Sequence, residues 1–348
     1  MGSVDADAHV YESEVTWSFI EEKDKKKFTP QVTTRTGGGE KIGDDGQQMQ
    51  YWIIDNCFHP KNNNLMPGTT AEQREMRSIS ARLAHMDEMG VDAQVIYTSI
   101  FLRPAVRTVA AELALTRAYN RWIGSVCSEA SDRLRWAMVP AIQSMDQNRA
   151  EIEWAKAHGA SAIMLRGTEW ERHLCDPYFF PLYEMAGEFD LPICIHSGNG
   201  SMSQHNFCLE DSSFTKFFQP CVGAFHSLVF KNIPAKFPNV RWGFVELGAQ
   251  WLPQVYMDLK RRLPRYGRRI SEDFLGANNM FVAANIYDDI NYITQFVGDS
   301  NLVLGTDYGH NDQSSRVDAF EVFRNRNDVD PVVIKKITDE NPRRLYNL

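Results

Sequence analysis

The stretch that decides the fold stands near the start of the chain and reads Val4-Asp5-Ala6-Asp7-Ala8-His9-Val10-Tyr11-Glu12. Side chains of a β-strand alternate between two faces, so Asp7 and His9 share one face and Ala6 and Ala8 the other. Two residues of the types that bind metal ions would therefore lie side by side. Taken alone, this pattern is more typical of an ordinary polar strand end.

Two later apolar runs end in residues of the same kind. The run 191–196 ends in His196, and the run 302–307 ends in Asp307. On its own, His196 also fits a core histidine, and Asp307 also fits a residue that forms a turn. Ligand-type residues at the ends of three separate strands are harder to explain by structure alone, and together they predict a shared site.

Outward from these runs, apolar strands alternate with helical patterns along the chain. The expected strands are 4–12, 93–98, 135–141, 161–166, 191–196, 240–246, 280–286 and 301–306, and the expected helices are 70–89, 105–130, 145–158, 178–189, 214–232, 252–262 and 331–346. Eight such strands predict an α/β fold, a (β/α)8 TIM barrel forming one domain over residues 1–348. An open doubly wound sheet is the alternative, but no glycine fingerprint follows an early strand.

The segment 13–77 has little periodicity and is rich in Lys, Gly, Asn and Thr. A segment this long inside a compact domain is usually functional or disordered, so we expect a lid-like insertion after the first strand that covers one mouth of the barrel. Within it, 37–39 predicts a flexible turn and 49–60 a short hairpin. Several aromatic and histidine side chains in predicted mouth loops are candidates for walls of a site: Trp17, Tyr51, Trp52, His59, Trp170 and His205.

Composition narrows the class of partner. The 348-residue chain has a formal net charge of -8 and no long basic run, which argues against nucleic acid or an anionic membrane. Its six cysteines are scattered without a Cys-x-x-Cys pair, which favours reduced thiols and a cytoplasmic location. Neither a secretory signal nor an apolar run of about 18–20 residues is present in the sequence, so a soluble protein is expected.

The strand-end residues predict a metal site. If Asp7, His9, His196 and Asp307 meet at the barrel mouth, two imidazoles and two carboxylates suit Zn²⁺ best, with Mn²⁺ or Fe²⁺ as alternatives. A bound divalent ion lowers the pKa of water toward neutrality, and a nearby carboxylate can then move its proton. Asp307 is a candidate for that catalytic role.

Other residues at predicted strand ends are candidates for acid/base work and substrate binding. Glu246 is a second catalytic candidate, since a carboxylate at an apolar mouth has a raised pKa; an ion pair with Arg241 or a helix cap is the alternative. Arg166 has a fork that matches a carboxylate, or it pairs with Glu169 or Glu171. Three further candidates for substrate contact follow the strand ends: His310, His226 and Arg103.

At this point the residues resemble a known family. Asp7-x-His9-x-x-Glu12, the segment 82–92, the run ending in His196, the segment 244–253 and Gly305-Thr306-Asp307-Tyr308-Gly309-His310 together look like the amidohydrolase superfamily. The branch includes aminocarboxymuconate-semialdehyde decarboxylase and the resorcylate-type decarboxylases. The resemblance implies a barrel with one divalent metal ion held by the four residues named above.

The sequence departs from that branch at two positions. Asp7 stands where the muconate-semialdehyde enzyme has His and the resorcylate enzymes have Glu, and Glu246 stands where those decarboxylases place a catalytic His. The main hypothesis is a metal-dependent decarboxylase acting on an aromatic or unsaturated carboxylic acid. The alternatives are a metal-dependent hydrolase of an amide, lactone or related bond, and an inactive barrel that serves as a binding protein. Barrel enzymes of this branch are often dimers, so a homodimer is expected by analogy.

Overall fold

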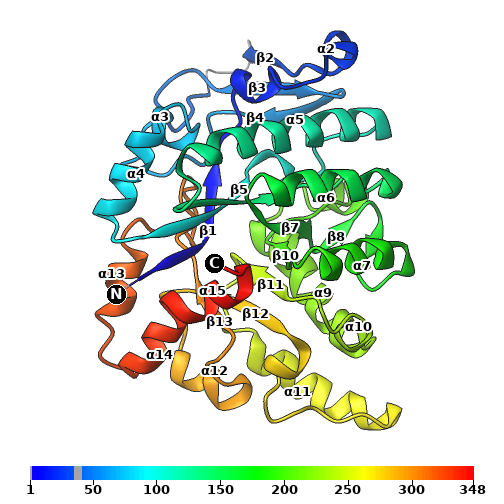
Figure 1. The fold of residues 1–348 in the computed structure, drawn as a ribbon, viewed down its shortest axis with the longest axis vertical. Coiled ribbons are helices and arrows are strands. Elements are labelled where there is room, and N and C mark those ends of the chain that lie inside the picture. Colours follow the sequence, from blue (N-terminus) through cyan, green and yellow to red (C-terminus); the bar gives the residue numbers. More distant parts are fainter. Residues whose placement is uncertain (1, 35–40) are drawn as a thin grey trace.

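The computed structural model describes residues 2–34 and 41–348. Its centre is one sheet of eight parallel strands in the order β1-β5-β6-β7-β10-β11-β12-β13 (Figure 1). The sheet closes because the His9 N–H donates to the Tyr308 carbonyl at 2.8 Å and the Asp307 N–H donates to the Asp7 carbonyl at 2.9 Å. The predicted (β/α)8 barrel is therefore confirmed. The strand bounds are β1 Val4–Val10, β5 Ala93–Thr98, β6 Leu134–Met138, β7 Ala160–Arg166, β10 Ile193–His196, β11 Trp242–Val245, β12 Met280–Ala284 and β13 Leu302–Leu304.

The strands are apolar because both faces of the sheet are covered. Every residue of β1, β7, β10, β11 and β12 is buried. Helices pack against the outer face and side chains fill the inside, which is the condition under which a parallel barrel is stable. Polar residues in these strands therefore stand out as buried groups that need partners.

Helices surround the barrel, and the last helix of the chain packs against the first strand. They are α4 Ile79–Glu88, α5 Val109–Cys127, α6 Asn148–Ala157, α7 Phe180–Glu188, α8 Met202–Phe207, α9 Gln219–Phe230, α10 Ile233–Lys236, α11 Leu252–Arg262, α12 Ile290–Val297, α13 Ala319–Arg324, α14 Pro331–Lys335 and α15 Asn341–Tyr346. The last helix lies against the first strand, where the Tyr346 hydroxyl donates to the Ala6 carbonyl at 2.7 Å (Figure 1). None of the helices within the described residues is long and apolar enough to cross a membrane.

Some helices differ from the expected pattern. The expected helix at 70–89 is two helices, α3 Ala71–Arg74 and α4, because Met76 has a left-handed backbone (φ 52°) and Ser78 caps a new start by accepting from the Ala81 N–H at 3.2 Å. Helices α12 and α13 have no counterpart among the expected elements, although Asp289 caps the start of α12. The predicted mouth loop that carries His205 contains the short helix α8.

The segment between β1 and α4 forms a small layer at the end of the barrel drawn uppermost in Figure 1. It contains α1 Glu14–Trp17, α2 Glu22–Phe28 and an antiparallel sheet of β2 Gln31–Thr34, β3 Gln50–Ile54 and β4 Cys57–Pro60. The hairpin expected at 49–60 is confirmed as β3 and β4. The turn expected at 37–39 lies outside the described residues.

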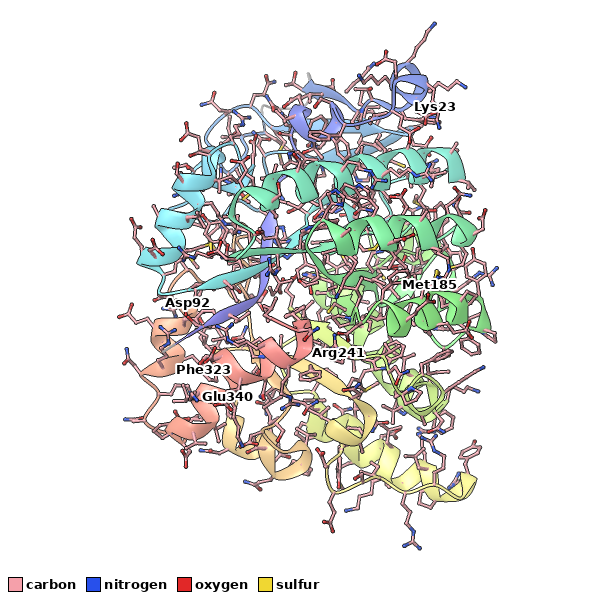
Figure 2. All side chains as sticks on the ribbon, viewed as in Figure 1. Lys23, Asp92, Met185, Arg241, Phe323 and Glu340 are labelled. Carbon is pink, nitrogen blue, oxygen red and sulfur yellow. The ribbon has the colours of Figure 1, made fainter. Side chains whose placement is uncertain are left out.

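The outer surface of this layer carries charged side chains, and its inner side carries buried rings. Lys23 of α2 projects into solvent and pairs with the exposed Glu21 (Figure 2). On the inner side, the Trp17 ring meets the Trp52 ring edge-on at 6.2 Å, and His59 Nε2 lies 3.1 Å from the Ala105 carbonyl of the barrel. The buried contact of His59 therefore joins the layer to the barrel.

Candidate metal centre and adjoining cavity

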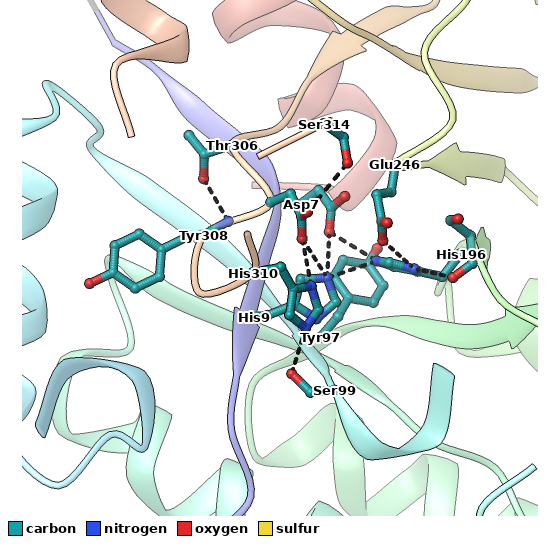
Figure 3. Close-up of polar contacts among 12 residues, drawn as sticks. Asp7, His9, Tyr97, Ser99, His196, Glu246, Thr306, Tyr308, His310 and Ser314 are labelled. Atoms are coloured by element: carbon teal, nitrogen blue, oxygen red, sulfur yellow. Dashed lines mark hydrogen bonds and ion pairs between the residues drawn. The ribbon is translucent and has the colours of Figure 1, made fainter. Parts of the chain in front are cut away.

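Asp7, His9 and His196 point at one another at the barrel mouth (Figure 3). With Glu246 they form one group whose ligand atoms all lie within 4.8 Å of one another, and His9, Glu246, Asp307 and His310 form a second such group. His9 Nε2 lies 3.0 Å from His196 Nε2, and 3.3 Å from Asp7 Oδ1. It also lies 3.4 Å from Asp307 Oδ1, while His196 Nε2 lies 3.1 Å from Asp7 Oδ1. Asp7, His9, His196 and Asp307 are almost completely buried. The structure thus brings Asp7, His9 and His196 together and places Asp307 in contact with His9.

The protons on the two imidazoles are fixed by backbone carbonyls. His9 Nδ1 lies 3.1 Å from the Thr98 carbonyl, and His196 Nδ1 lies 3.1 Å from the Ser197 carbonyl. A carbonyl only accepts, so each Nδ1 carries the proton and each Nε2 keeps a lone pair. The two lone pairs face each other beside carboxylate oxygens, and acceptors grouped so closely repel unless a cation lies among them.

The spacing of these atoms fits one metal ion. Bonds of about 2.0–2.2 Å from a metal to N and O donors place neighbouring donors about 3.0–3.5 Å apart. The separations of 3.0–3.4 Å around His9 Nε2 fall in this range. Carbonyl groups that orient the far side of a histidine are also typical of metal ligands. The residues present therefore fit a divalent ion with mixed nitrogen and oxygen ligands.

Asp307 is held by polar contacts on a strained backbone. It lies three residues after the end of β13 and has φ 50°, a left-handed conformation that is rare outside glycine. Its carboxylate accepts from His310 Nδ1 at 2.8 Å, from the Ser314 hydroxyl at 3.3 Å and from the Ser315 hydroxyl. Burial raises the pKa of Asp307 to about 6, and the neighbouring His310 opposes that shift.

Glu246 stands at the end of β11, also with a left-handed backbone (φ 63°). Its Oε2 lies 3.2 Å from His196 Nδ1. The alternative ion pair with Arg241 is not formed, because Arg241 binds Asp190 at 2.5 Å. Burial, followed by the charge of Asp307, raises the pKa of Glu246 well above its usual range. A cation among the neighbouring ligands would lower this pKa, so the state of Glu246 is coupled to metal binding.

His310 links Asp307 to the wall of the cavity. Its Nδ1 contacts Asp307, and its Nε2 lies 2.8 Å from the Ser99 hydroxyl. Burial lowers the pKa of His310, but the charge and hydrogen bond of Asp307 outweigh it, and the pKa is raised. The side chain also lines the cavity, so it is placed for the substrate contact that the sequence predicted.

A cavity of about 860 Å³ opens beside the cluster. Residues from three sources line it: the strand-end loops, the layer between β1 and α4, and the segment after β10. Of the side chains proposed as aromatic walls, Trp52 and His59 line it, whereas Trp17 packs behind Trp52 and Trp170 donates to Glu112 at 2.7 Å. The lining side chains include Tyr11, Trp52, His59, Lys61, Ser99, Arg103, Phe214, Phe217, Phe218, Glu246 and His310.

Two of the predicted substrate-binding residues do not line this cavity. Arg166 Nε donates to Glu169 Oε1 at 2.9 Å, and its Nη1 donates to the Phe101 carbonyl at 3.1 Å. Its alternative reading, a salt bridge to Glu169, is the one the structure shows. His226 Nε2 lies 2.9 Å from Asp258 Oδ2 on α11. Both side chains already have partners, so neither is kept as part of the candidate site.

The phenylalanines of the cavity wall were not expected from the sequence. Phe214, Phe217 and Phe218 lie in the first turns of the expected helix 214–232, which the structure forms as a π-helical turn before α9. A π-helical turn is often found at functional sites, but no residue pattern predicts it.

Ser314 and Ser315 also belong to the site and were not expected from the sequence. Their hydroxyls donate to Asp307, and both residues follow Asp307 within a polar run. This closeness in the sequence was the signal that could have identified them.

The chain is similar to known proteins both in sequence and in fold. A family model described as amidohydrolase matches residues 4–348. No curated protein matches the chain. Among solved structures, an amidohydrolase from Mycobacterium avium subsp. paratuberculosis K-10 superposes with a TM-score of 0.79 at 15% identity, over 99% of each chain.

Two further similar structures carry a metal ion. A 5-carboxyvanillate decarboxylase from Novosphingobium aromaticivorans, complexed with manganese and 4-hydroxy-3-methoxy-5-nitrobenzoic acid, has a TM-score of 0.66 at 16% identity, over 100% of this chain and 96% of that one. A dihydroxybenzoic acid decarboxylase from Polaromonas sp. JS666, with bound manganese and the inhibitor 2-nitroresorcinol, has a TM-score of 0.68 at 14% identity, over 100% and 97%. At these identities the likeness concerns the fold.

Proposed function

Because the chain belongs to the amidohydrolase family, we propose that it is a metal-dependent decarboxylase acting on an aromatic or unsaturated carboxylic acid. The observation that carries the proposal is the group formed by Asp7, His9 and His196, with Asp307 in contact with His9, beside a cavity with aromatic walls. The neighbours named as decarboxylases of aromatic acids support this choice of reaction.

We propose that the four ligands hold one divalent ion. The ion would bind oxygen atoms of the substrate and withdraw electron density from them. Two imidazoles and two carboxylates suit Zn²⁺, which we keep as the first candidate, while the manganese in the neighbouring structures supports Mn²⁺. Elemental analysis of the purified protein distinguishes the two, and a metal content far below one per chain would contradict the proposal.

The proposed chemistry needs one proton at the carbon that loses its carboxylate. As the bond to the carboxylate breaks, CO₂ leaves and the electron pair stays on the ring carbon, where it forms the new C–H bond. Protonated Glu246 supplies this proton, and water later returns one to its carboxylate. Asp307, hydrogen-bonded to His310, is the second acid/base group of the proposal.

The walls of the cavity are proposed to hold the ring and exclude water. A carboxylate that becomes neutral CO₂ loses its charge, so a site of low polarity favours the reaction. Trp52, Phe217 and Phe218 supply apolar surface for an aromatic ring. Because Trp52 and His59 come from the segment 13–77, we propose that this insertion acts as a lid over the single barrel domain.

The alternative is hydrolysis of an amide, lactone or related bond at the same metal centre. Glu246 favours it, because this carboxylate stands where the decarboxylases that the chain resembles have a catalytic histidine. The experiment measures CO₂ against released amine or acid for the metal-loaded enzyme on a panel of aromatic acids, amides and lactones. CO₂ from a carboxylate supports the decarboxylase, and release of amine or acid without any CO₂ would favour the hydrolase.

A cytoplasmic location and a homodimer complete the proposal. All six cysteines are unpaired, which fits a reducing compartment. Light scattering on the purified protein tests the dimer.

A further inference from the structure

Two strongly basic side chains line the cavity, and they differ in their partners. Lys61 pairs with Glu14 at 2.6 Å and lies over the Trp52 ring at 4.8 Å. The guanidinium of Arg103 makes neither an ion pair nor a side-chain hydrogen bond within the described residues, and only its backbone carbonyl is used, by Arg166. Arg103 is half-buried, so an unpaired charge there is unfavourable unless an anion joins it.

The side chains around Arg103 do not supply that anion. Its titratable neighbours include His59 and His205, and the charge of Arg103 adds to burial in lowering the pKa of both histidines to about 4. Both rings are therefore neutral at neutral pH. Burial also lowers the pKa of Arg103, with the Tyr11 hydroxyl as a weak opposing neighbour. The guanidinium fork is thus presented to the cavity beside neutral groups, which suits a planar carboxylate.

Arg103 and Glu246 lie on opposite sides of the barrel mouth. Arg103 follows β5, the second strand in the order around the barrel, and Glu246 follows β11, the sixth of eight. Both line the same cavity. A flat molecule that presents its reacting carbon to Glu246 therefore points its far end toward Arg103.

We propose that Arg103 binds a second carboxylate of the substrate, separate from the carboxylate that leaves. The substrate class is then an aromatic acid with two acidic groups. This inference rests on the proposed function, because it takes the reacting end of the substrate to lie at the Glu246 side of the cavity. Lys61 serves as the matched control, because it is a cation of the same cavity whose charge is already paired.

The experiment measures binding of benzoate and of the three benzenedicarboxylate isomers to the metal-loaded protein by calorimetry. We expect at least one diacid to bind about tenfold or more tightly than benzoate. Arg103→Met should weaken binding of that diacid about 10- to 100-fold and change benzoate binding by no more than about twofold. Lys61→Met should keep the preference for the diacid, and thermal unfolding confirms that each variant is folded.

Several results would overturn the inference. They are equal binding of benzoate and all diacids by the unchanged protein, equal weakening of both by Arg103→Met, or an effect of Lys61→Met as large as that of Arg103→Met. If Arg103→Met does not fold, Arg103→Lys provides the same test, since it keeps the charge, loses the fork and should weaken diacid binding alone. CO₂ release distinguishes the two proposals: CO₂ release from diacids that Arg103→Met leaves unchanged contradicts only this inference. Absence of CO₂ from any acid contradicts the proposed function, even where diacid binding depends on Arg103.

Discussion

His196 and Arg166 are register partners at the ends of the neighbouring strands β10 and β7, yet their surroundings are opposite in character. His196 faces His9 and Asp7, so lone pairs meet lone pairs. Arg166 faces Glu169 and two backbone carbonyls, so every contact joins a donor to an acceptor.

The difference teaches how to distinguish a site from a structural cluster among buried polar groups. Buried polar groups that satisfy one another stabilise the fold and need no ligand. Buried acceptors that converge without a donor need a cation from outside the chain. Changes at the His196 cluster should therefore affect metal content and activity, and changes at the Arg166 cluster should affect stability.

The largest effect is expected for His196→Ala. The variant loses one of two imidazole ligands, so metal content should fall far below one per chain and turnover should fall at least about 1,000-fold. Elemental analysis and the CO₂ assay measure the two effects. His226→Ala is the matched control because His226 pairs with Asp258 away from the cluster, and it should keep both metal and activity. A folded His196→Ala protein with a full metal content would contradict the assignment of the site.

Glu246→Gln should separate proton transfer from metal binding. The amide keeps the size of the side chain but cannot supply the proton, so kcat should fall about 100- to 10,000-fold. Metal content should stay near one per chain. Glu171→Gln is the control, since Glu171 binds Ser201 and Ser203 outside the cavity. Loss of metal together with activity in Glu246→Gln would instead make Glu246 a ligand.

Arg166→Met should show the opposite behaviour. It leaves the buried Glu169 carboxylate without its partner, and breaking such a pair destabilises a protein by about 3–5 kcal/mol. Urea unfolding measures the loss, and folded protein should still hold its metal. The double variant Arg166→Met with Glu169→Gln should recover part of the stability. A loss of activity without a loss of stability would mean that Arg166 contacts substrate after all.

Glu12 should give a smaller effect on the stability of the fold, and this effect should depend on pH. Like the cluster of Arg166, its buried carboxylate has partners within the chain. Its carboxylate accepts from the Ser99 and Ile100 N–H groups and from the Thr98 hydroxyl, and burial raises its pKa from 4.5 to about 7. The folded state thus binds the proton more tightly than the unfolded chain. The stability from this group is present below about pH 4.5 and is lost as the pH rises through about 7, by about 3 kcal/mol at most.

The measurement compares unfolding of the unchanged protein and Glu12→Gln between pH 5 and pH 8. Taking the difference at each pH removes the contribution of other groups, including the metal ligands. We expect the unchanged protein to lose more stability than Glu12→Gln over this range. Parallel pH profiles would show that Glu12 keeps an ordinary pKa.

The proximity of the proposed ligands was predictable from the sequence because strand ends of a parallel barrel meet at one edge. A histidine after five apolar residues and an aspartate after another apolar run had to lie near Asp7 and His9 once the barrel was inferred. The elements were predicted with the same success where apolar periodicity was strong. Helices α12 and α13 were missed, and Met76 interrupts an expected helix, because caps and turns override periodicity over short lengths.

The roles of the arginines could not be predicted in the same way. Arg166 and Arg103 both follow strands, and the sequence around Arg166 contains Glu169 and Glu171 as partners of equal standing. Only the fold shows that Glu169 engages Arg166 while Arg103 has no such partner among the described residues. The absence of a contact cannot be predicted from a sequence. The phenylalanines of the cavity wall depend on a π-helical turn, which no sequence pattern predicts either.

The closure of the barrel between β1 and the residues after β13 has a consequence for how the protein folds during synthesis. During synthesis Asp7 and His9 emerge from the ribosome well before Asp307, so the full set of donors cannot assemble until Asp307 has emerged. An ion that binds only the completed set favours the sealed barrel over every partly made form. The metal would thus stabilise the contact between β1 and the residues after β13 in the folded protein.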